Sequence, residues 1–251
     1  MAEPPLAGRA ALVTGGARNL GAAIALRLAG LGCPVAVHHN ASRKEALALV
    51  ARLRSHGRIA AAVQADLSDP KAARALIPAA EKALGRPIEL LVNNAASFLP
   101  GRLGDLTWGR LEDSLKLDAW APFELTRAFA ARLGPRRRGT VVNLLDARIE
   151  DYDWDHVGYF LAKRLLADLT RLSAVAYAPR VTVNGVAPGP VTDPPGEAGF
   201  LERIRKHLPL RRTPTPGDVA DAVAYLLGAR NVTGEVLFVD GGRHLGRAVY
   251  G

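Results

Sequence analysis

The chain has 251 residues, of which 49% are hydrophobic and 23% are charged. This balance excludes a disordered or fibrous chain, because enough apolar side chains are present to build one substantial core. The single cysteine, Cys33, excludes an internal disulfide and any zinc or iron–sulfur site made from several cysteines. We therefore expect a globular protein of a reducing compartment, with no bound metal.

The first residues and the net charge bear on location and partners. Residues 1–5 contain an acid and two prolines, whereas a signal peptide needs basic residues followed by a long apolar run. The chain also has no run of about 18 uncharged apolar residues. The net charge is +9. The arginines and lysines are scattered along helical patterns, and their longest cluster, residues 136–138, lies in an expected surface turn. We expect a cytoplasmic protein that binds a small anionic molecule, and neither nucleic acid nor membrane.

Short apolar runs alternate with longer helical patterns along the whole chain, which is typical of repeated strand–helix–strand units. Strands are expected at residues 9–13, 34–38, 59–64, 89–92, 139–145, 181–186 and 236–239. Helices are expected at residues 20–31, 42–56, 70–84, 108–117, 122–133, 157–178 and 216–227. The predicted fold class is α/β: a Rossmann-type, doubly wound, mainly parallel seven-stranded sheet with helices on both faces. The alternation leaves no room for a second core, so we expect one domain over residues 1–251.

Residues 188–216 break this regularity. The segment contains seven prolines around a short helical piece near residues 200–206. It follows the sixth strand and therefore lies at the carboxyl edge of the sheet, where open α/β folds bind their ligands. The segment is either a substrate lid or a rigid surface loop.

A glycine-rich turn directly follows the first strand. It reads Thr14-Gly15-Gly16-Ala17-Arg18-Asn19-Leu20-Gly21, and a helical pattern begins at its end. Glycines in this position let backbone amides approach a pyrophosphate at the positive end of a helix. Asn19 is the residue type that best tolerates a positive φ there. The turn predicts a dinucleotide site, and a purely structural tight turn is the alternative.

The end of the second strand indicates which dinucleotide is bound. It reads His38-His39-Asn40-Ala41-Ser42-Arg43, without the acid that usually meets a free ribose 2′-hydroxyl. Arg18, Ser42 and Arg43 instead suit a 2′-phosphate, because guanidinium groups bind phosphate through charge-assisted hydrogen bonds. The sequence therefore predicts NADPH over NADH, with a contribution from the histidines.

Tyr159 and Lys163 stand four residues apart in a helical pattern and share one face. A nearby ammonium favours the phenolate and lowers the pKa of a tyrosine, which suits proton transfer near neutral pH. Three further features occur in the same order: the glycine turn, Asn93-Asn94-Ala95 at a strand end, and Pro188-Gly189 after another. Over essentially the whole chain this combination resembles the short-chain dehydrogenase/reductase family.

The resemblance implies roles for residues at matching positions. Tyr159 handles the substrate proton, and Lys163 also holds the nicotinamide ribose. The glycine turn surrounds the phosphates, Asp66 and Leu67 lie near the adenine, and Asn93 lines the cofactor groove. The family is often tetrameric, which implies a homotetramer here. The cofactor-binding residues predicted in this way are Gly15, Arg18, Asn19, Leu20, Gly21, His38, His39, Asn40, Ser42, Arg43, Asp66, Leu67, Asn93, Ala95, Tyr159, Lys163, Pro188 and Gly189.

Two positions depart from the common family pattern. The serine usually found thirteen residues before the tyrosine is Asp146, and the usual helix asparagine is Asp118. An ionised carboxylate cannot donate to a developing alkoxide, and at about 4 Å it repels one by on the order of 4 kcal/mol. Asp146 instead suits a substrate with N–H donors and keeps the Tyr159 phenol protonated, unless Asp146 is itself protonated in a dry site.

This variation resembles the pteridine reductase subgroup, whose pattern also includes Arg18, His38 and the run of residues 93–100. There a phenylalanine, here Phe98, stacks a flat bicyclic ring against the nicotinamide; a core role for Phe98 is the alternative. We predict NADPH-dependent reduction of a pterin or dihydrofolate C=N bond. The catalytic residues are Tyr159, Lys163, Asp146 and Asp118, and the substrate-binding residues are Phe98, Asp146 and Tyr159.

Two other functions remain open. One is a carbonyl reductase acting on 3-oxoacyl thioesters, sugars or other ketones, with Asp146 tolerated by protonation. The other is a regulatory protein that binds NADP without catalysis, against which the intact Tyr159 and Lys163 argue. Trp108 and Trp120 fall in helical patterns and are expected in the core, and the aromatic residues within 151–155 either line the substrate pocket or pack in a loop.

Overall fold

The computed structural model describes residues 6–193 and 196–246. At its centre is a seven-stranded sheet with the order β3-β2-β1-β4-β5-β6-β7, in which every neighbouring pair is parallel. The Rossmann-like α/β fold predicted from the sequence is confirmed, and the strand ends differ from the prediction by one or two residues. The strands are β1 (Ala10–Val13), β2 (Val35–His39), β3 (Ala60–Gln64), β4 (Ile88–Asn93), β5 (Gly139–Leu144), β6 (Val181–Pro188) and β7 (Val236–Val239).

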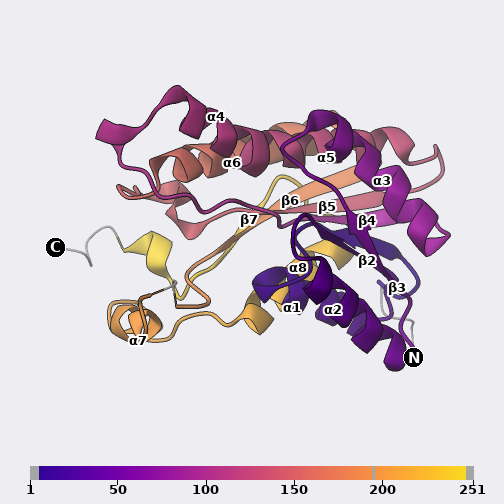
Figure 1. Ribbon diagram of the computed structural model, residues 1–251, viewed down its shortest axis with the longest axis horizontal. Coiled ribbons are helices and arrows are strands. Elements are labelled where there is room, and N and C mark those ends of the chain that lie inside the picture. Colours follow the sequence, from indigo (N-terminus) through magenta and orange to yellow (C-terminus); the bar gives the residue numbers. More distant parts are fainter. Residues whose placement is uncertain (1–5, 194–195, 247–251) are drawn as a thin grey trace.

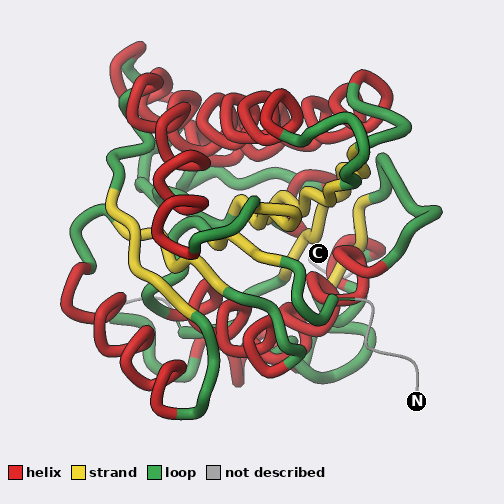
Figure 2. The backbone as a smooth tube through the Cα atoms, turned by 90° about the vertical axis from the view of Figure 1, so that its right-hand side faces the viewer, coloured by secondary structure: helices red, strands yellow, loops and turns green. Residues whose placement is uncertain are grey.

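Helices cover both faces of the sheet (Figures 1 and 2). Successive strand residues point to opposite faces, so in β1 Val13 packs into one core cluster and Leu12 into another. Both side chains are fully buried, as expected for a parallel sheet enclosed by crossover helices. One face carries α1 (Asn19–Gly30), α2 (Arg43–Ser55) and α8 (Pro216–Gly228), and the other carries α3 (Pro70–Leu84), α5 (Ala121–Arg132) and α6 (Val157–Ala176).

The gap predicted between two helices near residue 120 is wrong. The chain runs from α4 (Trp108–Leu115) through a π-helical turn, η2 (Lys116–Trp120), directly into α5. A π-turn inserts an extra residue into a helix, and such turns are frequent at functional sites. Here the turn buries Asp118 completely, while the predicted core residues Trp108 and Trp120 are 69% and 45% exposed. The helical period therefore shifts within this segment, which a uniform 3.6-residue pattern does not predict.

Since all strands are parallel, their carboxyl ends lie along one edge of the sheet. Three short 3₁₀ turns lie in segments that follow strands: η1 (Leu103–Asp105), η3 (Ala147–Glu150) and η4 (Arg243–Leu245). The predicted short helix in the proline-rich segment is α7 (Phe200–Arg205), and the Asp193 carboxylate accepts hydrogen bonds from the backbone near its start.

Parts of two predictions fall outside the described residues. These are residues 1–5, on which the location prediction rested, and residues 194–195 of the proline-rich segment. Among the described residues, no helix has both the length and the apolar character needed to cross a membrane.

Candidate active site

The glycine turn between β1 and α1 packs directly against the segment that follows β4. Gly15 has φ of 59° and Asn19 has φ of 49°, so the expected left-handed conformation of Asn19 is found. A Cβ atom on Gly15 would lie 3.0 Å from the Ala95 Cα atom. A Cβ atom on Gly21 would lie only 2.1 Å from the Gly15 carbonyl oxygen. The tight turn therefore requires glycine at both positions, because the backbone leaves no space for a side chain.

His38 fixes this turn from the end of β2. Its Nδ1 atom accepts a hydrogen bond from the Gly15 amide at 3.1 Å, so its Nε2 atom carries the proton that is donated to the Ala65 carbonyl, also at 3.1 Å. Burial lowers the pKa of His38 to about 4, and the imidazole is neutral at pH 7. Both ring nitrogens are already engaged within the protein. His38 consequently positions the glycine turn, and it also lines the cavity beside that turn.

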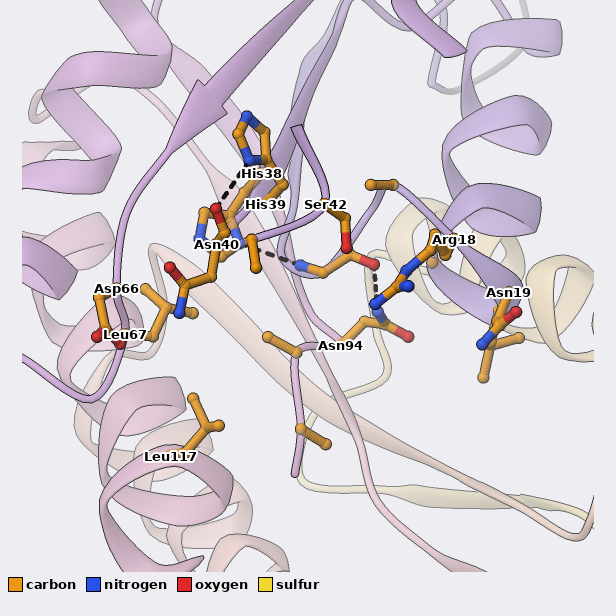
Figure 3. A pocket seen from close by; sticks show the side chains of 17 residues that line it. Arg18, Asn19, His38, His39, Asn40, Ser42, Asp66, Leu67, Asn94 and Leu117 are labelled. Carbon is orange, nitrogen blue, oxygen red and sulfur yellow. Dashed lines mark hydrogen bonds between the residues drawn. The ribbon is translucent and has the colours of Figure 1, made fainter. Parts of the chain in front are cut away.

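A cavity of about 440 Å³ opens beside the turn at the carboxyl edge of the sheet (Figure 3). Arg18 and Asn19 lie on one side of it, and Asp66 and Leu67 lie across the opening (Figure 3). Most of the predicted cofactor residues line it. The complete lining is Gly15, Ala17, Arg18, Asn19, Leu20, Gly21, His38, His39, Asn40, Ala41, Ser42, Asp66, Leu67, Asn94, Ala95, Ala96 and Leu117.

Six of the predicted cofactor residues lie outside this lining: Arg43, Asn93, Tyr159, Lys163, Pro188 and Gly189. Arg43 is exposed at the start of α2, and the ion pair beside the cavity joins Arg18 to Glu45 at 3.9 Å. Asn93 is buried within the sheet, where its amide donates to the Asn143 side-chain oxygen at 2.8 Å. Side-chain direction explains why neither residue lines the cavity: Arg43 lies on an exposed face of α2, and the Asn93 side chain is held within the sheet layer.

Asn94, which the sequence reasoning did not select, lines the cavity in place of Asn93. Its side-chain amide donates to the Thr14 carbonyl at 2.9 Å and to the Gly15 carbonyl at 3.2 Å. It thereby ties the end of β4 to the glycine turn. Strand alternation was the available signal, since adjacent residues at a strand end face different directions.

Pro188 and Gly189 lie at the end of β6, outside the lining of this cavity. The Gly189 amide donates to the Val239 carbonyl at 2.9 Å, and a Cβ atom on Gly189 would lie 3.0 Å from the Asp240 Cα atom. Glycine therefore permits β6 and the end of β7 to approach closely where the proline-rich segment begins.

The four predicted catalytic residues are brought together at the ends of β5 and α6. The Tyr159 hydroxyl donates to Oδ2 of Asp146 at 3.3 Å. One turn along α6, the Lys163 ammonium donates to the Leu144 carbonyl at 2.6 Å and lies 5.5 Å from the centre of the Tyr159 ring. Asp146 is held in place because its Oδ1 atom accepts from the Arg148 amide at 2.8 Å and caps η3.

Asp118 reaches this cluster from the π-turn. Its two carboxylate oxygens accept from the Ser97 amide at 2.7 Å and from the Ser97 hydroxyl at 2.8 Å. Burial raises the pKa of Asp118, while the nearby Lys163 ammonium and the Ser97 donors oppose that rise. Asp118 thus fixes the segment after β4 and adds a second acidic group to the surroundings of Lys163.

The electrostatics of the cluster favour a protonated phenol. Burial, followed by the charges of Asp146 and Asp118, raises the pKa of Tyr159 well above its usual value. The pKa of Lys163 is lowered by burial, against the effect of the same two carboxylates. The expectation that Lys163 leaves Tyr159 with a lowered pKa is wrong, because burial and the carboxylates dominate. The expectation that Asp146 keeps the phenol protonated agrees with this result.

Phe98 forms an aromatic wall beside the phenol. Its ring stacks on His156, with centroids 3.8 Å apart, and meets the Tyr159 ring edge-on at 5.0 Å. The side chain is 55% exposed, which excludes the alternative of a core role.

The candidate site thus has two parts: the cavity beside the glycine turn, and the cluster at the start of α6 that holds a proton donor, a hydrogen-bond acceptor and an aromatic wall. The turn fits the phosphates of a dinucleotide, because Gly15 and Gly21 leave the backbone uncovered. The protonated Tyr159 phenol can donate a proton, and the Asp146 carboxylate can accept from an N–H group. Within the described residues, no group of three or more His, Cys, Asp or Glu side chains could hold a metal ion.

Comparisons with known proteins agree with this architecture. A family model described as enoyl-(acyl carrier protein) reductase matches residues 15–244. The crystal structure of FolM alternative dihydrofolate reductase 1 from Brucella canis, complexed with NADP, superimposes with a TM-score of 0.90 and 36% identity, covering 98% of each chain.

Two curated relatives extend over the same length. Pteridine reductase 1 of Leishmania tarentolae is 34% identical, covering 95% of this chain and 97% of the relative. A putative ketoacyl reductase of granaticin polyketide synthase from Streptomyces violaceoruber is 35% identical, covering 94% and 96%. From the fold, the site and these matches, the chain belongs to the short-chain dehydrogenase/reductase family.

Proposed function

We propose that the protein is an NADPH-dependent reductase of the C=N bond of a pterin or dihydrofolate. The observation that carries this proposal is the contact between the Asp146 carboxylate and the Tyr159 phenol at 3.3 Å. A carboxylate in this place is poorly suited to a ketone, because it repels the alkoxide that would form. It is well suited to a nitrogen heterocycle, because such a ring offers N–H groups to an acceptor.

The dinucleotide would occupy the 440 Å³ cavity. Gly15, Arg18 and Gly21 would surround its phosphates, and Asp66 and Leu67 would lie at the adenine. Arg18 and Ser42 line the cavity and would meet the 2′-phosphate. Lys163 would hold the nicotinamide ribose. The NADP complex of the Brucella canis structure supports this choice of cofactor.

When bound, NADPH supplies a hydride, and the chain supplies the proton. Tyr159 donates that proton from its hydroxyl to the ring nitrogen of the substrate, and its raised pKa keeps it protonated until then. Asp146 accepts a hydrogen bond from a neighbouring N–H group and so orients the ring. Phe98 covers one face of the ring and limits how it can enter.

The names of two relatives support this substrate class. One is called an alternative dihydrofolate reductase and the other a pteridine reductase, and each matches almost the whole chain. Both proteins are named for the reduction of bicyclic nitrogen rings, which is the chemistry that the Asp146 carboxylate favours.

The test is a substrate panel of a dihydropterin, dihydrofolate and an acetoacetyl thioester, followed by the absorbance of NADPH. We expect turnover of the first two compounds and little turnover of the thioester. Asp146→Ser should shift the preference toward the thioester by about tenfold or more, since the repulsive charge is replaced by a hydroxyl donor. Turnover of the thioester alone by the unmodified protein would contradict the proposal.

A 3-oxoacyl thioester or other ketone is the second candidate substrate. It is favoured by the relative named as a putative ketoacyl reductase. This function would require an alkoxide to be accommodated beside Asp146. The same substrate panel distinguishes the two functions, because turnover of the thioester alone would favour the ketone.

We further propose that residues 1–251 form one cytoplasmic domain that assembles as a homotetramer, with residues 188–216 as its substrate loop. The outer side of α6 supports assembly, because several of its apolar side chains are exposed. These are Leu161, Leu165, Leu172 and Val175. Light scattering of the purified protein would give the mass of the assembly.

A further inference from the structure

The Tyr159 side chain belongs to a closed cycle of side-chain contacts. Tyr159 donates to Asp146, and Asp146 accepts from the Arg148 amide. The Arg148 guanidinium pairs with Asp153. Asp153 in turn contacts the His156 ring. The cycle then returns to Tyr159 through two aromatic contacts, from His156 to Phe98 and from Phe98 to Tyr159. The aromatic wall and the proton donor are thus held by one connected set of side chains.

Asp153 is the most firmly held member of this cycle of contacts. Its side chain is only 6% exposed, and Oδ1 accepts from the Asp155 amide at 2.9 Å and from the His156 amide at 3.0 Å. The His156 ring lies against the same carboxylate, with Nδ1 at 3.3 Å. Burial opposes the ionisation of Asp153, but Arg148 and these donors lower its pKa and keep it charged. The carboxylate therefore determines which way the His156 ring faces.

The Phe98 ring packs against His156. The backbone on either side of Phe98 is held by the Ser97–Asp118 hydrogen bonds and by the bridge between Gly101 and His156, and the stacking contact of the ring with His156 is nearly parallel, at 18°. More than half of the Phe98 side chain is still exposed, so ring surface remains for a flat ligand. A substrate on that surface would extend the stack that His156 begins.

We propose that His156, oriented by Asp153, is a positioning residue that sets the specificity for flat heterocycles by fixing the Phe98 ring beside Tyr159. The inference rests on the proposed function and adds to it residues that the family resemblance did not suggest. His156 acts through Phe98 and not on the reacting atoms. Its loss should therefore weaken substrate binding and leave the chemical step largely intact.

The test compares three single variants in steady-state assays with NADPH and a dihydropterin. Since one stacked pair is worth a few-fold to about tenfold in affinity, His156→Ala should raise KM by about 3- to 10-fold with kcat within about 2-fold. His156→Phe keeps a ring for stacking but loses the contact with Asp153, so it should restore the wild-type KM in part. His56→Ala, on the exposed end of α2, is the matched control and should behave as the wild type.

A double-mutant cycle shows whether His156 acts through Phe98. In a Phe98→Ala background, His156→Ala should change KM by less than about 2-fold, because the residue that His156 positions is already gone. Melting temperatures and NADPH affinity, measured for every variant, identify any general loss of folding. His156→Phe keeps the test valid if the alanine variant is poorly folded.

The outcomes separate the two proposals. If the unmodified protein reduces neither the dihydropterin nor dihydrofolate, the proposed function fails and this inference fails with it. If the protein reduces the dihydropterin but His156→Ala leaves KM unchanged, or lowers kcat alone, only the positioning role is overturned. The same holds if the two substitutions have additive effects on KM.

Discussion

The two ends of the site are built in different ways. At the cofactor end, the glycine turn is shaped by close backbone contacts and fixed by His38, which burial keeps neutral. At the chemical end, the charges of Asp146 and Asp118 help to raise the pKa of the Tyr159 phenol, and the Lys163 ammonium lies 5.5 Å from the centre of its ring. Burial favours the neutral form of both His38 and Tyr159; His39 adds to this effect at His38, and the carboxylates of Asp146 and Asp118 add to it at Tyr159.

The difference teaches which kind of change each end tolerates. The cofactor end should be sensitive to added volume and tolerant of changes in surface charge. The chemical end should respond to the loss of one polar atom even where volume is conserved. Each prediction below tests one side of this contrast.

The largest effect is expected from Tyr159→Phe, which removes the hydroxyl and almost no volume. We expect kcat to fall by about 10³-fold, as for the loss of a general acid, while NADPH affinity stays close to that of the wild type. Absorbance assays and direct titration with NADPH measure the two quantities. Unchanged activity in the cell would instead favour a regulatory protein that binds NADP without catalysis.

The second effect concerns pH and His38. The pKa of His38 is about 4 in the fold and 6.5 in an unfolded chain, so the unfolded state binds more protons between these values. The free energy of unfolding should therefore fall by about 3 kcal/mol as the pH decreases from 6.5 to 4. His38→Asn keeps an acceptor for the Gly15 amide without titrating, and it should lose this part of the pH dependence. Denaturant titrations at pH 7 and 4.5 give the free energy of unfolding of both proteins. An equal decrease in the two proteins would show that His38 does not cause the pH dependence.

Gly21→Ala tests the volume limit of the turn. The new Cβ atom would meet the Gly15 carbonyl oxygen at 2.1 Å, so we expect NADPH to bind about 30-fold more weakly, which corresponds to about 2 kcal/mol of strain. Gly30→Ala is the matched control in the same helix, because nothing lies within 4 Å of its added Cβ atom. Equal affinities of the two variants for NADPH would show that the turn adapts.

The smallest effect is expected from the exposed arginines. Arg18→Ala should weaken NADPH binding by about 5-fold and NADH binding less, since Arg18 lines the cavity but remains largely in solvent. Arg43→Ala should change either affinity by less than about 2-fold, because Arg43 lies outside the cavity lining. A larger loss for Arg43→Ala would mean that the cofactor extends along α2.

The sheet and the shared helix face of Tyr159 and Lys163 could be predicted from the sequence, because both follow from local patterns. Alternating strands and helices determined the fold class, and the four-residue separation of Tyr159 and Lys163 placed them on one face of α6. The Asp146 contact with Tyr159 also followed, since the end of β5 and the start of α6 lie at the same edge of the sheet.

Other features depend on direction or on tertiary contacts, which local patterns do not contain. Asn93 and Asn94 are identical in type and adjacent, and only strand geometry shows that Asn94 lines the cavity. The π-turn around Asp118 leaves no mark in the hydrophobic spacing. The stacking of Phe98 on His156 joins segments 58 residues apart, so no local pattern in the sequence predicts it.

The stretch from Ala147 to His156 has a consequence for how such enzymes diversify. It is irregular apart from one short turn, and it carries Arg148, Asp153 and His156 without contributing to the sheet. Mutations there can reshape the aromatic wall while the dinucleotide cavity, which this stretch does not line, stays intact. For a protein engineer who wants to change which ring is accepted, this is the stretch to randomise first.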